Sequence, residues 1–212
     1  MDLGFTKASS LAIIDRQLED IARNITPAQY EIIRQVIYVT ADLDYRSLLK
    51  FSDDVLALGA NAVTAMTPII VDVPEIQVSI VPQLQKTFGN PVYCCGTTKG
   101  DVIKKTTKAA QGLEILASKY PQSIFIVGQD QAAMSSLITL LQNKVVEPRL
   151  AIATPPTFGD NSKQRLIEFL VPYICLEDDK GGAGVAAAIF NSLVNLTWQI
   201  SSENKENLIS NQ

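Results

Sequence analysis

From Pro68 onward, short apolar runs alternate with longer segments that have helical spacing. The runs cover residues 69–73, 92–95, 124–127, 150–153 and 173–176. Each run is bounded by Pro, Gly or polar residues, and none shows the apolar–polar alternation of a strand with one solvent-facing side. Such runs are typical of parallel strands that are covered on both faces.

The segments that follow the runs predict helices near residues 75–87, 102–120, 132–143, 162–170 and 184–198. Strands and helices that alternate in this way form a doubly wound α/β domain. We therefore expect a mainly parallel sheet of about five strands with helices on both faces. The 212 residues, 47% of them hydrophobic, suit a single domain over residues 1–200. The polar stretch 201–212 is expected to be a disordered tail.

An N-terminal helical segment is expected to precede this sheet. Apolar residues recur at helical spacing between Leu11 and Ile21, with charged residues between them. Residues 26–29 (Thr-Pro-Ala-Gln) have the form of a capping box with proline at the first helical position, and the helix they open should run to about Tyr38. A third helix is predicted near residues 47–58, ending at Gly59.

The chain contains no histidine, which excludes several kinds of catalytic site. Ser-His-Asp and Cys-His catalysis and histidine-ligated zinc all need an imidazole. A formal net charge of −4 argues against general nucleic-acid binding. The three cysteines do not make a disulfide framework, the start does not resemble a secretory signal, and no apolar run approaches the roughly 20 residues that span a bilayer. These features predict a cytoplasmic protein without a membrane or nucleic-acid partner.

Because parallel strands end at one edge of the sheet, the loops after them form the natural site. Asp72 could act as a general base or cap the following helix. Residues 96–100 (Gly-Thr-Thr-Lys-Gly) could hold a carboxylate or form a solvated loop. Residues 180–184 (Lys-Gly-Gly-Ala-Gly) could present backbone amides to an anion, or their glycines could serve a tight turn and close helix packing. Walker A and G-x-G-x-x-G loops are absent, which disfavours a nucleotide cofactor.

The order and spacing of short motifs over residues 10–196 resemble one family, precorrin-8X methylmutase. Residues 10–14 (S-L-A-I-I) resemble the family's S-F-x-I-I, and residues 68–72 (P-I-I-V-D) resemble its first strand. Residues 106–110 (T-T-K-A-A) resemble T-R-[SA]-A-A, and residues 126–128 (I-V-G) resemble its I-G. Residues 153–163 resemble G-x-P…F-V…E-S-K, and residues 181–191 resemble G-G-S…A-A-A…N. No single motif is specific, but their order is.

This resemblance implies a cofactor-free isomerase of cobalamin biosynthesis. The family moves a methyl group from C-11 to C-12 of the corrin precursor, a 1,5-sigmatropic shift that gives hydrogenobyrinic acid, and some members act on the cobalt-containing analogue. It also implies a homodimer whose pocket takes the carboxylate-rich tetrapyrrole near the subunit interface. The substrate-binding residues carried over by position are Ser10, Asp72, Thr98, Lys99, Thr106, Thr107, Lys108, Gln129, Phe158, Ser162, Lys163, Gly181 and Gly182.

The sequence departs from the family at the residue that the family uses for proton transfer. The family's M-I-H-A-x-G stretch falls on residues 36–41, so Tyr38 stands where the histidine is taken to protonate a ring nitrogen. A phenol is a far weaker acid than imidazolium, but it can donate a hydrogen bond. Tyr38 is therefore the candidate catalytic residue.

Other departures leave two alternatives open. Thr107 stands where the family has arginine, and the basic stretch before Gly181 reads Glu-Asp-Asp-Lys, which should weaken the binding of a polycarboxylate. One alternative is a catalytically impaired paralogue that binds, carries or senses a tetrapyrrole or corrinoid. The other is an enzyme that uses Tyr38, Lys99 or Asp130 on a less anionic ligand.

Overall fold

The computed structural model describes residues 3–98, 106–159 and 161–210. In chain order the elements are α1 (Leu3–Gln17), α2 (Pro27–Thr40), α3 (Tyr45–Leu48), β1 (Leu49–Phe51), α4 (Val55–Thr64), β2 (Ile69–Val71), α5 (Pro74–Gln85), β3 (Val92–Cys94), the 3-10 turn η1 (Cys95–Thr97), α6 (Lys108–Lys119), β4 (Ile124–Val127), α7 (Gln131–Gln142), β5 (Leu150–Ala153), α8 (Ser162–Leu166), β6 (Tyr173–Leu176) and α9 (Ala183–Ser210).

The sheet has six strands in the order β1-β6-β5-β4-β2-β3. The five strands from β2 to β6 run parallel and correspond to the five predicted apolar runs. The predicted α/β fold with a mainly parallel sheet is thus confirmed. Because β4 pairs with β2 and not with β3, the winding of the chain reverses between β2 and β4.

The edge strand β1 and the helix α4 replace the single helix predicted over residues 47–58, which was wrong. β1 is extended because it pairs antiparallel with β6, a long-range contact that local patterns do not reveal. Gly59 does not end a helix but lies inside α4, where an added Cβ would be 2.9 Å from Cδ2 of Leu193. The missing side chain therefore lets α4 pack closely against α9.

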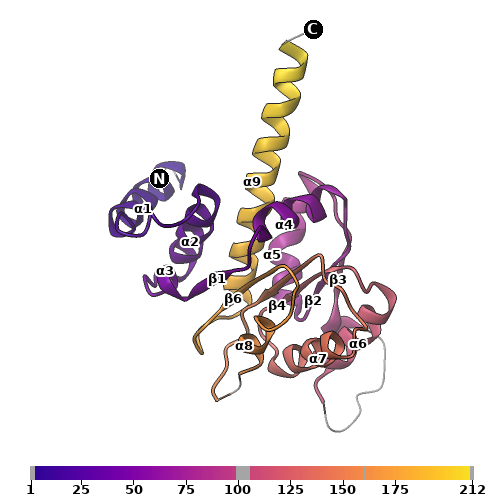
Figure 1. Cartoon of the computed structure of the whole chain (residues 1–212). Helices are drawn as coiled ribbons and strands as arrows, with labels where there is room; N and C mark the ends of the chain where they lie inside the picture. The colour runs from indigo at the N-terminus through magenta and orange to yellow at the C-terminus, as the bar shows by residue number, and fades with distance from the viewer. Residues whose placement is uncertain (1–2, 99–105, 160, 211–212) are drawn as a thin grey trace.

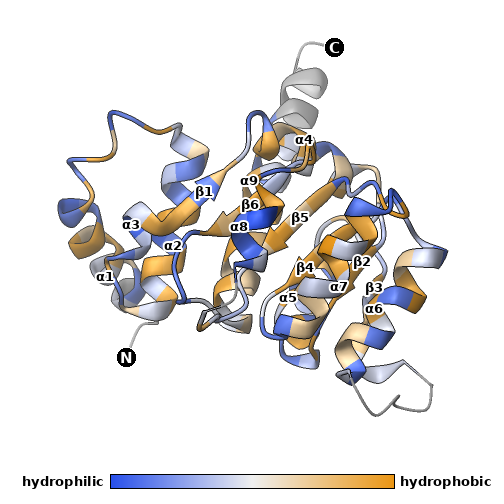
Figure 2. Ribbon diagram, turned by 60° about the horizontal axis from the view of Figure 1, so that its bottom comes forward, coloured by the Kyte–Doolittle hydropathy of each residue, from blue (hydrophilic) through white to orange (hydrophobic). Residues whose placement is uncertain are grey.

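Two sets of helices bury the two faces of the sheet, and Figure 2 shows the hydrophobic strands between them. Ile69 and Val71 of β2 belong to the core formed with α2, α4, α5 and α9. Ile70, between them, belongs to the core formed with α6, α7 and α8. All three side chains are fully buried. Successive side chains alternate across a strand, so a sheet covered on both faces needs apolar residues at every position.

The N-terminal helices lie to one side of the sheet, next to β1 (Figure 1). The predicted capping box is present, because Thr26 Oγ1 accepts the Gln29 N–H at 3.2 Å and Gln29 Oε1 accepts the Thr26 N–H at 2.9 Å. α2 buries its apolar face against α9. An ion pair of 2.6 Å between Arg34 and Asp15 joins α2 to α1.

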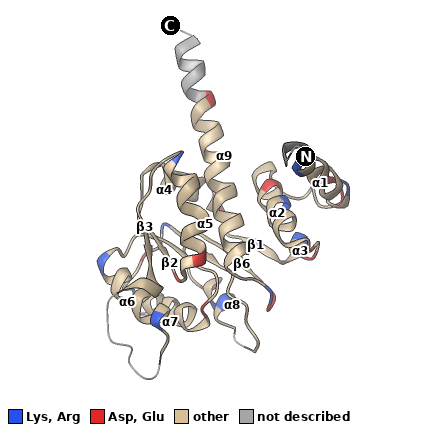
Figure 3. Cartoon of the chain, turned by 180° about the vertical axis from the view of Figure 1, so that it is seen from behind, with Lys and Arg blue, Asp and Glu red and all other residues tan. Residues whose placement is uncertain are grey.

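Helix α9 starts in the core and extends beyond the body of the protein (Figure 1). In Figure 3, where charged residues are coloured red or blue, the helix is almost entirely tan up to the part drawn in grey. Residues 183–203 are long and apolar enough to cross a membrane, which the sequence did not lead us to expect, but half of this window is buried within the protein, as in a core helix. The helix reaches Ser210, inside the stretch for which the sequence predicted a disordered tail, because no Gly or Pro follows Gly184 within it.

Candidate functional site

A shallow cavity of about 510 Å³, wide open to solvent, lies at the carboxyl ends of β4 and β5, beside the start of α6. Its lining residues are Thr107, Gln129, Asp130, Gln131, Ala132, Pro156 and Phe158. Three predicted substrate-binding residues thus meet here: Thr107, Gln129 and Phe158. The Phe158 side chain is 85% exposed, so its ring is available to the face of a flat ligand.

Thr107 and Asp130 connect the helices on the two sides of this cavity. Thr107 caps α6 by accepting the Ala110 N–H at 3.1 Å, and its hydroxyl donates to Asp130 Oδ1 at 2.9 Å. Asp130 in turn caps α7 by accepting the Ala133 N–H at 2.7 Å. The first turns of α6 and α7 are therefore held together, which fixes this wall of the cavity.

Asp72 is fully buried at the end of β2, where the winding of the sheet reverses. Its carboxylate accepts three backbone N–H groups from residues 128–130, at 3.1, 2.8 and 2.7 Å. It does not cap α5, whose N-cap is Val73 without a side-chain hydrogen bond. Burial raises the pKa of Asp72, and the three amide donors oppose that rise. Asp72 thus shapes the loop that carries Gln129.

The glycine-rich loop after β6 packs tightly on the end of β5. Gly181 has φ of +150°, and an added Cβ there would lie 2.1 Å from the Thr154 carbonyl oxygen. The Gly182 N–H donates to the same oxygen at 2.7 Å. The next amide, that of Ala183, faces Gln129 Oε1 at 3.4 Å. Because protein atoms accept from both amides, the geometry favours the tight-turn interpretation over an anion site.

Lys163 and Ser162 lie at the start of α8 and are buried. The Lys163 ammonium donates to the carbonyl oxygens of Asp178 and Lys180, the latter at 3.1 Å. A fully buried lysine held by two backbone carbonyls supports the loop after β6, and it does not line the cavity.

The other predicted substrate-binding residues are spread over several elements. Thr98 donates its hydroxyl to the Cys95 carbonyl at 2.8 Å, beside η1. Thr106 and Lys108 are exposed at the start of α6. Ser10 donates to the Thr6 carbonyl at 3.0 Å within α1. Lys99 lies outside the described residues.

Tyr38 is in the last turn of α2 and is 37% exposed. The Lys7 ammonium lies over its ring, 5.4 Å from the centroid. Tyr38 does not line the cavity that contains Thr107 and Phe158. Within a single chain, the candidate catalytic residue Tyr38 therefore lies outside that cavity.

Two contacts of the loop after β6 were missed by sequence reasoning. Lys180 lies 2.7 Å from Asp42 and 2.6 Å from Asp44, both just after α2. Thr157 donates its hydroxyl to Asp179 at 3.2 Å. No local pattern could have found the Lys180 pairs, because their partners lie far apart in the sequence.

The cysteines and acids offer little for other chemistry. Burial raises the pKa of Cys94 and Cys95, and raises that of Cys175 to about 12, as expected for thiols in the core. Among residues 3–98, 106–159 and 161–210, no three His, Cys, Asp or Glu side chains are grouped to hold a metal ion.

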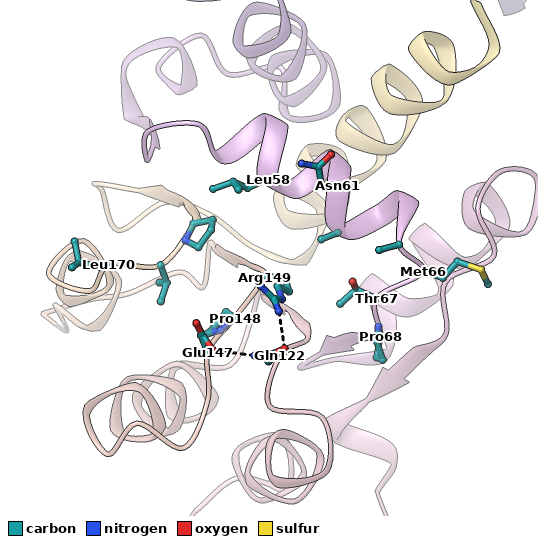
Figure 4. Close-up of a pocket in the computed structure, with 14 residues that line it drawn as sticks. Leu58, Asn61, Met66, Thr67, Pro68, Gln122, Glu147, Pro148, Arg149 and Leu170 are labelled. Atoms are coloured by element: carbon teal, nitrogen blue, oxygen red, sulfur yellow. Dashed lines mark hydrogen bonds between the residues drawn. The ribbon is translucent and has the colours of Figure 1, made fainter. Parts of the chain in front are cut away.

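A second cavity, of about 710 Å³, lies at the opposite edge of the sheet, near the strand starts (Figure 4). Gln122 bridges its two charged residues, accepting from Arg149 at 2.7 Å and donating to Glu147 at 3.0 Å. Leu58 of α4 and Leu170 before β6 form part of its apolar lining. None of the predicted site residues lies here.

The winding of the sheet and the cavity at its carboxyl edge define a doubly wound α/β protein of the kind that binds small molecules between strand-end loops. The sequence profile of one family, precorrin-8X methylmutase, matches residues 6–196. The chain belongs to the precorrin-8X methylmutase family, which confirms the resemblance seen in the sequence.

Individual relatives agree with this assignment. The chain is 29% identical over 206 residues to the cobalt-precorrin-8 methylmutase of Synechocystis sp., covering 90% of this chain and 94% of the relative. It is 29% identical to the cobalt-precorrin-8 methylmutase of Methanocaldococcus jannaschii, covering 85% and 86%. Among solved structures, the precorrin-8X methyl mutase of Thermus thermophilus superposes with a TM-score of 0.80 at 25% identity, covering 91% of this chain and 96% of the other.

Proposed function

We propose that this protein is an isomerase of cobalamin biosynthesis that moves a methyl group from C-11 to C-12 of precorrin-8X or its cobalt complex. The observation that carries the proposal is the family match to residues 6–196, which contain Tyr38 and the strand-end loops. Similar proteins are named for both forms of the substrate, cobalt-precorrin-8 in Synechocystis sp. and precorrin-8X in Sinorhizobium sp.. Both forms therefore belong in the test.

The rearrangement is intramolecular, so it needs no second substrate. The bond from C-11 to the methyl group breaks as the bond from C-12 forms, and the product is an isomer of the substrate. The protein has to bind the macrocycle, hold it in the reactive geometry and stabilise charge that develops on the ring. Tyr38 is the proposed donor to a ring nitrogen, since a phenol can donate where the family uses imidazolium.

The cavity supplies groups that suit a flat, carboxylate-bearing ligand. Phe158 offers an exposed ring to the face of the macrocycle. Gln129 accepts from the Ala183 amide through Oε1, so its amide NH₂ group is directed elsewhere and can donate to a carboxylate. The Thr107 hydroxyl donates its one hydrogen to Asp130 on the same wall, so it orders the wall and does not donate to the ligand.

We also propose that the protein works as a homodimer in the cytoplasm. Tyr38 and the cavity are separate in one chain, and a dimer that places Tyr38 of one protomer at the cavity of its partner would complete the site. Light scattering at the assay concentration tests this proposal. A monomer that retains full activity would contradict it.

The test of function is a visible-absorbance titration with precorrin-8X and its cobalt complex, followed to the rearranged product. We expect the wild-type protein to bind and convert one of them. Tyr38→Phe should lower kcat by about 10²–10⁴-fold, the usual effect of losing a proton donor, and Tyr38→His should raise it above wild type. Tyr120→Phe is the matched control, because that phenol pairs with Tyr93 and Lys119 directly after α6 and does not line the cavity.

The outcomes separate the alternatives. Tight binding without conversion by the wild type would indicate a tetrapyrrole carrier or sensor. Absence of binding would show that the fold serves a different ligand. Conversion by Tyr38→Phe at the wild-type rate would remove Tyr38 from the mechanism while leaving the isomerase function intact.

A further inference from the structure

The loop between β6 and α9, residues 177–182, and Ala183, the first residue of α9, contact two of the loops that form the cavity. The Thr157 N–H, in the loop after β5, donates to the Asp179 carbonyl at 3.0 Å, and the Thr157 hydroxyl donates to Asp179 Oδ1 at 3.2 Å. Gln129, in the loop after β4, accepts the N–H of Ala183 at 3.4 Å. The loop thus holds both sides of the cavity in register.

The same loop also contacts the N-terminal helices through an ion-pair cluster. The Lys180 ammonium lies 2.7 Å from Asp42 Oδ2 and 2.6 Å from Asp44 Oδ2. Hydrogen bonds to the two carboxylates raise the pKa of Lys180, and the hydrogen bond from Lys180 lowers the pKa of Asp42. Lys180 and Asp42 therefore keep their charges at neutral pH, and the cluster joins segments 136 to 138 residues apart in the chain.

The backbone of Lys180 is held firmly on the side of the sheet. Its carbonyl accepts from the buried ammonium of Lys163 at 3.1 Å. Two residues later, Gly182 donates to the carbonyl of Thr154, directly after β5, at 2.7 Å. Because its backbone is held in place, the Lys180 ammonium can in turn hold the carboxylates of Asp42 and Asp44.

The segment on the other side of the cluster also has local hydrogen bonds. Thr40 donates its hydroxyl to the Val36 carbonyl at 2.8 Å, and the Asp42 N–H donates to Thr40 Oγ1 at 3.3 Å. Ile37 is buried against α9, but the next residues, Tyr38 and Val39, point outward and are exposed. The helix then ends at Ala41, which adopts a left-handed conformation with φ of +55°. The turn after Tyr38 is anchored by Asp42, whose carboxylate bonds to Lys180.

We propose that Lys180 is a positioning residue for the methyl shift. By binding Asp42 and Asp44, it fixes the end of α2, with Tyr38, to the loop that braces the cavity of the same chain, so that in the proposed dimer Tyr38 of each protomer is held at a set position relative to the cavity of its partner. This inference rests on the proposed function. Lys180 itself needs no contact with the substrate, because its effect on the reaction passes through Tyr38.

Kinetics of Lys180→Met test this role against a matched control. Lys50→Met is the control, because Lys50 has a similar exposed fraction (40% against 37%) and pairs with Glu177 of the same loop at 3.0 Å. We expect Lys180→Met to lower kcat by about 10- to 100-fold, as for a misplacement of about 1 Å, with KM changed by less than about threefold. The control should keep kcat within about twofold. Equal kcat in Lys180→Met and wild type would overturn the proposal.

A double-mutant cycle separates positioning from general damage to the fold. If Lys180 acts through Tyr38, then adding Lys180→Met to Tyr38→Phe should lower kcat by less than about threefold further. If instead the double variant loses kcat by the product of the two single fold-losses, the proposal is overturned.

Amide hydrogen exchange over residues 38–44 provides a readout that does not depend on turnover. We expect faster exchange in Lys180→Met and unchanged exchange in Lys50→Met. If the wild type fails to convert precorrin-8X or its cobalt complex, the proposed function fails, and exchange still decides whether Lys180 holds the turn. Unchanged exchange in Lys180→Met would overturn the positioning role in either case.

Discussion

The glycine-rich stretch after β6 offers a paired test of how the carboxyl edge is assembled. At Gly181 an alanine Cβ would lie 2.1 Å from the Thr154 carbonyl oxygen, and φ is +150°. Cβ contacts shorter than 3.0 Å are essentially unknown, so the backbone would have to move by 0.9 Å, the difference between those distances. At Gly184 nothing lies within 4 Å of the added Cβ.

The expected sizes follow from this geometry. In Gly181→Ala, backbone strain costs about 1–3 kcal/mol. The shift also disrupts the 2.7 Å hydrogen bond from Gly182 to Thr154, a loss of about 1 kcal/mol or more. A combined loss of about 3 kcal/mol would lower Tm by about 6–12 °C in a chain of this size. Gly184→Ala lies inside α9 and should stabilise by up to about 1 kcal/mol, because alanine is the better helix former.

Thermal unfolding followed by circular dichroism measures both variants. A Tm of Gly181→Ala within about 2 °C of wild type would refute the reasoning, since the close approach would then not constrain the loop. Equal losses in both variants would also refute it, because they would show a general intolerance of side chains in this stretch.

Two further predictions concern buried or partly buried acids and phenols. Asp72→Ala should lower the free energy of unfolding by about 2–4 kcal/mol, because the three amides of residues 128–130 lose their acceptor. Urea denaturation measures this loss. A variant as stable as the wild type would contradict the role given to Asp72. Burial and the hydrogen bond to Asp15 raise the pKa of Tyr30 from 10.0 to about 12, so the folded state keeps this proton longer than the unfolded state and stability should fall as pH rises from 10 to 12. Tyr30→Phe should lower the free energy of unfolding by about 0.5–1.5 kcal/mol at pH 7. In this variant the free energy of unfolding should also fall less steeply between pH 10 and 12. If the slope is the same as in the wild type, Tyr30 is not the cause of the fall.

The acidic stretch before Gly181 has a different meaning in the structure than in the sequence. By composition it should repel a polycarboxylate. In the fold, Glu177 pairs with Lys50 at 3.0 Å and Asp179 accepts from Thr157 at 3.2 Å. Asp178 accepts the Asp179 N–H. All three carboxylates thus have partners within the protein, which reduces the repulsion that favoured a non-catalytic paralogue.

Much of the fold could be predicted because it depends on local patterns. The five parallel strands follow from apolar runs without alternation, and the start of α2 follows from the capping box at Thr26. β1 could not be predicted, because three residues become a strand only by pairing with β6. The same limit explains the error at Gly59, whose role is to admit Leu193 of α9.

Some features of the candidate site could likewise be predicted from the sequence, and others depend on the fold. The sequence alone determined the family, the α/β class and the edge of the sheet where Thr107, Gln129 and Phe158 meet, because motif order and strand direction are properties of the chain itself. Only the tertiary structure decided that Asp72 and Lys163 support loops and that Lys180 joins Asp42 to the sheet. Those roles depend on which polar groups burial brings together, and residues more than a hundred positions apart become partners only when the chain folds.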